Sequence, residues 1–178
     1  LLPFALALAL VLATTSHALA GDPDITTDFV IPGVTVANPT TFMFAGLCSS
    51  VQGAGVPPAS PFKVTKASQV EFAVLDGQSV SMAVLQYAPG GINVLHTHLR
   101  SVELLVVVKG WLEVGFIDST NKLFVQTPQT EDMFVFSKGL PHYQLNRDGK
   151  YPAIAVSAFG NANAGTKCCH RNSERQKT

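Results

Sequence analysis

The stretch that decides the fold runs from Gly90 to Gly110 and reads GGINVLHTHLRSVELLVVVKG. Within it, His96 and His98 are separated by one residue, so on a β-strand both imidazoles project from the same face. Glu103 opens a run of Leu and Val in which both strand faces are otherwise apolar. A carboxylate in such a strand needs a partner or a metal ion. Taken alone, these residues also fit two histidines in a surface loop and a charge at a strand end.

Outward from this stretch, the chain between about Thr41 and Phe159 alternates short apolar runs with Gly, Pro, Asn, Asp and Ser. This spacing predicts an all-β domain of antiparallel hairpins that close into a sandwich or small barrel. The expected strands lie near residues 42–45, 62–66, 69–75, 79–87, 102–108, 112–117, 122–126, 132–137, 142–145 and 153–158. Gly110 and Gly139 fall at turns, where we expect positive φ.

A third histidine, His142, lies in a second block that reads FVFSKGLPHYQLN over residues 134–146. At this spacing the two blocks resemble the two motifs of the cupin family in its germin-type form. The resemblance to plant germin-like proteins covers about residues 21–165 and implies a single cupin β-barrel or jelly roll. It also implies one manganese ion, and the ligands that it implies are His96, His98, Glu103 and His142.

The donor types alone leave the metal open. Three imidazoles and one carboxylate leave coordination positions for water or a small ligand, and Mn, Fe, Zn and Cu all accept such donors. A hard oxygen ligand suits Mn or Fe, whereas the general order of affinities favours Cu or Zn.

Two positions bear on the reaction. Germins that oxidise oxalate resemble one another in two active-site asparagines, of which Asn93 matches one, whereas Ala83 stands in place of the other. Alanine cannot hydrogen-bond a substrate carboxylate, and losing such a donor costs on the order of a hundredfold in rate. The resemblance therefore implies a catalytic role for Asn93 and favours superoxide dismutase activity over oxalate oxidase activity.

Other functions stay open beside this one. The resemblance extends to non-enzymatic germin-like proteins of the cell wall and to storage or small-ligand-binding relatives. An enzyme of this kind would take superoxide or a small carboxylate. The second motif also departs from the family, because Glu131 stands where a turn glycine is usual and Ser137 where a proline is usual. Both are turn-shaping positions near His142.

The N-terminal residues Leu1–Ala20 are uncharged and end in Ala-Leu-Ala, which predicts a signal peptide cleaved after Ala20. The alternative is a membrane anchor, which a short apolar core interrupted at residues 14–17 disfavours. Because the first residue is Leu and no basic start precedes the core, we expect an incomplete signal peptide. We expect a secreted protein of the apoplast or cell wall, with an N-terminal extension over residues 21–40 and the cupin domain over 41–165.

At the other end, residues 166–178 change composition. From Lys167 onward they contain four Lys or Arg against one Glu, without branched aliphatic or aromatic side chains, which predicts a disordered basic tail. The resemblance implies a further strand and a C-terminal helical segment at this place, so we expect an alternative or frame-shifted terminus that lacks both. Without these elements we expect an exposed sheet edge and weaker self-association. The homo-oligomer typical of the family is then not expected, and a dimer stays open. A product too unstable to function by itself is a further alternative.

The composition excludes several function classes. With 12 Lys and Arg against 12 Asp and Glu, the chain has no net charge and no general electrostatic footprint for nucleic acid. After Ala20 no apolar run is long enough to cross a bilayer. Gly53-Ala54-Gly55 is followed by Val-Pro-Pro, which cannot open a dinucleotide-binding helix. The three cysteines, Cys48, Cys168 and Cys169, do not suit a disulfide framework.

Overall fold

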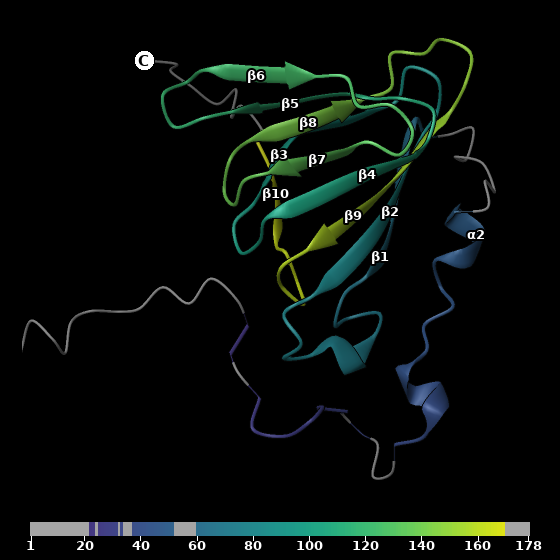
Figure 1. The fold of residues 1–178 in the computed structure, drawn as a ribbon, viewed down its shortest axis with the longest axis vertical. Helices are drawn as coiled ribbons and strands as arrows, with labels where there is room; N and C mark the ends of the chain where they lie inside the picture. Colours follow the sequence, from purple (N-terminus) through teal and green to yellow (C-terminus); the bar gives the residue numbers. More distant parts are fainter. Residues whose placement is uncertain (1–21, 24, 32, 34–36, 52–59, 170–178) are drawn as a thin grey trace, which may run out of the picture.

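Two five-stranded sheets form the body of the protein, and every strand pairing in them is antiparallel (Figure 1). The structure is a computed structural model that describes residues 22–23, 25–31, 33, 37–51 and 60–169. The first sheet has the order β1 (Phe62–Ala67), β2 (Ser81–Tyr87), β9 (Ala153–Phe159), β4 (Glu103–Lys109), β7 (Met133–Phe136). The second has the order β10 (Thr166–Cys168), β3 (Ile92–His98), β8 (His142–Leu145), β5 (Glu113–Ile117), β6 (Leu123–Gln126).

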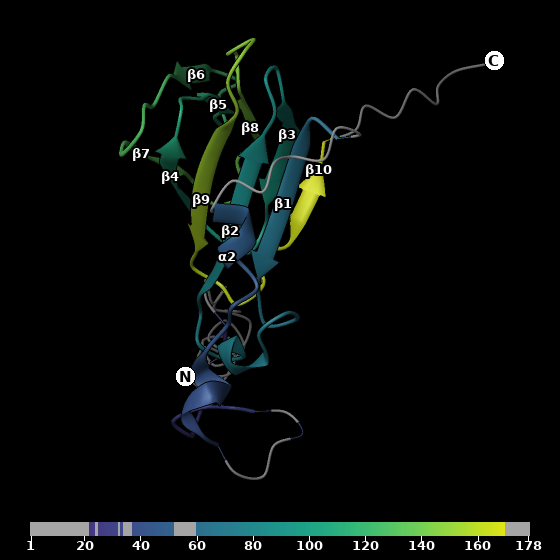
Figure 2. The same cartoon turned by 90° about the vertical axis from the view of Figure 1, so that its right-hand side faces the viewer.

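The predicted all-β architecture is confirmed. Eight of the ten expected strands are present, as β1, β2 and β4 to β9. Between the sheets, the core packs apolar side chains of both layers, among them Tyr87, Leu105 and Phe136 of the first sheet and Val114 of the second. Figure 2 shows the short helix α2 (Cys48–Val51) beside β2, outside the sheets.

Two expected strands are wrong, because local hydrogen bonds turn the chain at each place. Near residues 42–45, the Asn38 side chain accepts the Thr40 N–H and caps a short 3-10 helix, η1 (Pro39–Phe42). Within 69–75, the chain bends at Ser68, whose N–H and O–H both donate to Glu71, and continues into η2 (Ala73–Leu75). Among the described residues, none of the helices has the length and apolar character needed to cross a membrane.

The prediction of a disordered tail over residues 166–178 is wrong for Thr166–Cys168. These residues form β10 and pair with β3, with Thr166 opposite His98 and Cys168 opposite His96. All three side chains are exposed, so the strand is held by backbone hydrogen bonds, which a prediction based on apolar burial does not register. The expectation was an exposed sheet edge, and β10 covers one edge of β3. Residues 1–20 and 170–178 lie outside the described part of the chain.

Turn glycines occur where they are expected. Gly110 and Gly139 have φ of 78° and 79°. Glu131, which takes the place of a turn glycine, also has a positive φ of 75°. A residue with a Cβ is strained in this region, so the turn keeps the glycine conformation without the glycine.

Replacing Glu131 by Gly should raise the free energy of unfolding by about 0.5–1 kcal/mol, since relief of the Cβ clash outweighs the added chain entropy. The Glu131 side chain is exposed, and its backbone N–H donates to Val107 O at 2.8 Å whichever residue is present. Urea denaturation measures the change. Lys150→Gly is the control, because Lys150 is an exposed loop residue without positive φ, and it should destabilise. A loss of stability in both variants would contradict strain at Glu131.

Candidate metal centre

Four side chains predicted as ligands meet between the two sheets. His96 and His98 come from β3, His142 begins β8, and Glu103 begins β4 in the opposite sheet. One ligand atom from each lies within 4.8 Å of the others. All four side chains are buried, with Glu103 only 2% exposed. The alternative of surface-loop histidines and a strand-end charge is therefore wrong.

A β-bulge shapes the strand that carries the histidines. Asn93 pairs with Gln144 and His96 pairs with His142, so β3 has one residue more than β8 between these positions. In a regular strand, residues three apart point to opposite faces, whereas the extra residue lets Asn93 and His96 both line the same cavity. The bulge thus adds an amide to the face that already holds His96 and His98.

The imidazoles present their Nε2 atoms to the centre. Nδ1 of His96 lies 2.8 Å from Val94 O, and Nδ1 of His142 lies 2.8 Å from Leu140 O. A backbone carbonyl only accepts hydrogen bonds, so these Nδ1 atoms carry protons and the Nε2 atoms of both rings face the centre. Hydrogen bonds of this kind orient metal-binding histidines.

The charges at the centre call for a cation. Glu103 Oε2 lies 3.1 Å from His98 Nε2 and 3.0 Å from His142 Nε2. Burial by itself raises the pKa of Glu103, but hydrogen bonds from His142 and His98 outweigh it and hold the pKa at about 2. A carboxylate oxygen this close to two imidazole nitrogens needs a proton or a metal ion between them. Three imidazole nitrogens and one carboxylate oxygen fit a first-row transition metal ion.

His96 differs from its neighbours in the centre by its electrostatics. Burial, reinforced by the nearby His142, lowers its pKa from 6.5 to about 4. His96 is therefore neutral at neutral pH, with its Nε2 lone pair available to a metal ion.

Glu103 is oriented by residues that the sequence analysis missed. Its Oε1 accepts hydrogen bonds from Ser157 Oγ at 2.6 Å and from Gln144 Nε2 at 3.5 Å. Gln144 Oε1 in turn accepts from Asn93 Nδ2 at 2.7 Å and from the Tyr87 hydroxyl at 3.4 Å. Both residues are fully buried. Ser157 is the one polar residue of the otherwise apolar strand β9, which is a signal in the sequence, whereas Gln144 stands two residues after His142 and so shares its strand face.

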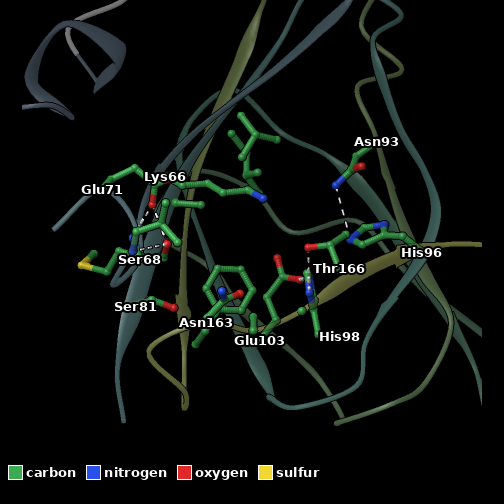
Figure 3. A pocket seen from close by; sticks show the side chains of 18 residues that line it. Lys66, Ser68, Glu71, Ser81, Asn93, His96, His98, Glu103, Asn163 and Thr166 are labelled. Atoms are coloured by element: carbon green, nitrogen blue, oxygen red, sulfur yellow. Dashed lines mark hydrogen bonds and ion pairs between the residues drawn. The ribbon is translucent and has the colours of Figure 1, made fainter. Parts of the chain in front are cut away.

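A cavity of about 330 Å³ leads to the centre (Figure 3). Asn93 lines it, and its Nδ2 lies 3.5 Å from His96 Nε2. Ala83 lies in the same lining and offers only a methyl group. On the tail side, Thr166 Oγ1 lies 3.3 Å from His98 Nδ1.

Comparison with known proteins agrees with this geometry. Residues 60–171 match the cupin family. Germin-like protein 9-3 of Oryza sativa subsp. japonica is 50% identical over 163 residues, which cover 89% of this chain and 76% of that protein. The chain is a germin-like protein of the cupin family.

Solved structures show the same relationship. A structure of oxalate oxidase is 31% identical to this germin-like protein, with a TM-score of 0.68, covering 83% of this chain and 81% of that one. A recombinant oxalate oxidase in complex with glycolate is 29% identical, with a TM-score of 0.67 and coverage of 83% and 80%. The buried histidine–glutamate group of this germin-like protein fits a cupin metal site.

The metal-free germin-like protein should lose stability as the pH falls from about 6.5 to about 4. The unfolded chain protonates His96 near its ordinary pKa of 6.5, whereas the folded chain resists protonation down to about 4. The contribution of neutral, buried His96 to the free energy of unfolding is fully present above pH 6.5. Relative to pH values below 4, it amounts to at most about 3 kcal/mol. Urea denaturation at pH 7, 5.5 and 4 after chelation measures it. His96→Gln should flatten this part of the profile, and an unchanged slope in that variant would assign the pH dependence to other groups.

Replacing Ser157 by Ala should weaken metal binding by roughly 10- to 100-fold, because Glu103 loses the hydroxyl that fixes its Oε1. Competition with a chromophoric chelator measures the affinity. Ser119→Ala removes a hydroxyl from an exposed turn and should leave the affinity unchanged. Equal affinities in both variants would show that Ser157 does not position the carboxylate.

Proposed function

We propose that this germin-like protein is a secreted manganese protein with superoxide dismutase activity. The observation that carries the proposal is the convergence of His96, His98, Glu103 and His142 at the end of a cavity open to small molecules. A bound manganese ion would supply the one-electron chemistry by which two superoxide ions and two protons yield dioxygen and hydrogen peroxide. The chain's own residues hold the ion and orient what approaches it.

The choice of manganese rests on the donor set and on relationship. Glu103 is ionised at neutral pH and contributes a hard oxygen ligand, which suits manganese or iron. The germin-type motifs imply manganese for the same four positions. Iron, zinc and copper are outcomes that elemental analysis separates.

Superoxide is favoured over oxalate because of the cavity wall. One Asn93 amide N–H donates to Gln144, and the other, which lies near His96 Nε2, would become open to a substrate once that nitrogen binds a metal ion. Ala83 provides no second donor for a dicarboxylate. A diatomic anion needs fewer contacts than oxalate does. Asn93 is thus proposed to contact the substrate as a catalytic residue.

A second candidate function is small-ligand binding without turnover. The cavity is larger than a diatomic molecule requires, and Val64, Leu85 and Phe159 contribute apolar surface to it. A germin-like protein of the cell wall with a structural metal would use the same cavity to hold a small ligand. Ligand binding without dismutase turnover would favour this function.

Location and assembly belong to the proposal as well. Export to the apoplast rests on the predicted signal peptide, whose residues lie outside the described part of the chain. A dimer, rather than the homo-oligomer typical of the family, is supported by exposed apolar side chains on the outer face of the first sheet: Met82 on β2, Leu104 on β4, and Met133 and Val135 on β7.

Purified Gly21–Thr178 should contain manganese near one ion per chain and should dismutate superoxide. Elemental mass spectrometry and a superoxide assay measure both in one preparation. The double variant His96→Ala/His142→Ala should lose the metal and the activity, with folding checked by circular dichroism. Tyr143→Phe is the control, since Tyr143 follows His142 but hydrogen-bonds Glu113. A folded wild-type protein without metal would refute the proposal, and a metal-loaded protein without turnover would leave the binding function.

A further inference from the structure

The cavity that reaches the metal centre is lined by a positive charge that the histidine–glutamate cluster does not use. Among the described residues that line this cavity, Lys66 on β1 is the only Lys or Arg. Figure 3 shows the Lys66 side chain extending into the cavity from the wall that faces Asn93 and His96.

Strand register places Lys66 on the inner face. In the β1–β2 pair, Lys66 lies directly opposite Ala83, so both side chains project from the same face of the sheet. Ala83 is buried and lines the cavity with its methyl group. The short Ala83 side chain leaves space at this wall of the cavity, and the longer Lys66 side chain beside it places an ammonium group there.

The ammonium of Lys66 makes no direct ion pair with a described residue, and its charge reaches Glu71 only as a lesser cause, after the hydrogen bond from Ser68, of the lowered pKa of that carboxylate. Among the described residues, no ion pair within 4.0 Å and no hydrogen bond involves its Nζ. The two carboxylates that line the cavity have closer partners than Lys66. Glu71 accepts from Ser68 N at 3.0 Å and from Ser68 Oγ at 2.5 Å, and Glu103 lies against His98 and His142.

We propose that Lys66 is the anion-anchoring residue of this cavity, which holds a small oxygen anion between its ammonium and the histidine–glutamate centre. Superoxide and a short carboxylate share this chemistry. A lysine ammonium acts as a mobile point charge that attracts either anion, and a charged cavity wall raises the rate at which an anion arrives. The inference rests on the proposed function, because it assigns the substrate class of the same site.

The test compares charge variants of one strand. Lys66→Met removes the charge from the cavity, and Lys66→Arg keeps it. Lys63→Met is the matched control, because Lys63 lies on β1 three residues away, projects from the other face and does not line the cavity. Glu71→Gln removes the negative charge at the cavity wall and should tighten anion binding.

Glycolate is titrated calorimetrically into each variant, both metal-loaded and stripped with chelator, and metal content is measured alongside. Lys66→Met should bind glycolate roughly tenfold more weakly or worse, the scale of a lost charged hydrogen bond, while Lys66→Arg and Lys63→Met stay near the wild type. In the superoxide assay, Lys66→Met should lower kcat/KM and flatten its dependence on ionic strength, with kcat little changed.

The two anions give separate results. A loss confined to glycolate binding assigns the anchor to carboxylates, and a loss confined to kcat/KM assigns it to superoxide. Wild-type glycolate affinity and wild-type salt dependence in metal-loaded Lys66→Met would overturn the inference. A wild-type protein without metal would instead refute the proposed function, and glycolate binding that still depends on Lys66 would then support the anchor by itself.

Discussion

A single buried carboxylate, that of Glu103, constrains the rest of the structure. A charged oxygen in the interior is tolerated only when each of its lone pairs has a partner. Oε2 lies against two imidazoles from the second sheet, and Oε1 accepts a hydrogen bond from Ser157 on β9, the strand beside β4. Because those partners come from both layers, the carboxylate is satisfied only when the two sheets have closed over each other. The packing of the two sheets and the formation of the centre therefore depend on each other.

The sequence predicts this centre unevenly, for physical reasons. The spacing of His96 and His98 shows a shared strand face, and a lone Glu103 in an apolar strand signals a buried partner, so these residues could be found without coordinates. The placement of Asn93 on the same face depends on a β-bulge, which shifts side-chain alternation by one residue and leaves no mark in composition. Tertiary pairing, not local sequence, brings Ser157 and Gln144 to Glu103.

The same distinction explains the errors in the strands. Residues 69–75 have the composition of a strand, but Ser68 and Glu71 close a turn by side-chain hydrogen bonds, and local bonds of this kind compete with sheet pairing. Lys66 illustrates the opposite case. As an exposed lysine in an edge strand it resembles an ordinary solvated charge, and only its register with Ala83 turns it toward the cavity.

The last described strand bears on the centre itself. With β10 in place, β3 has a neighbour on both sides, so the backbone that carries His96 and His98 is hydrogen-bonded along both edges. The Nδ1 atoms of His96 and His142 face backbone carbonyls, which fix the position of the proton, whereas Nδ1 of His98 faces the Thr166 hydroxyl. A hydroxyl can donate or accept, so Thr166 can hydrogen-bond His98 Nδ1 whether or not that nitrogen carries the proton. The contact therefore suits both the metal-free ring and a ring that would bind a metal ion through Nε2. The short strand β10 thus completes the support of the third imidazole through its backbone pairing with β3 and the Thr166 hydroxyl, although none of its side chains is buried.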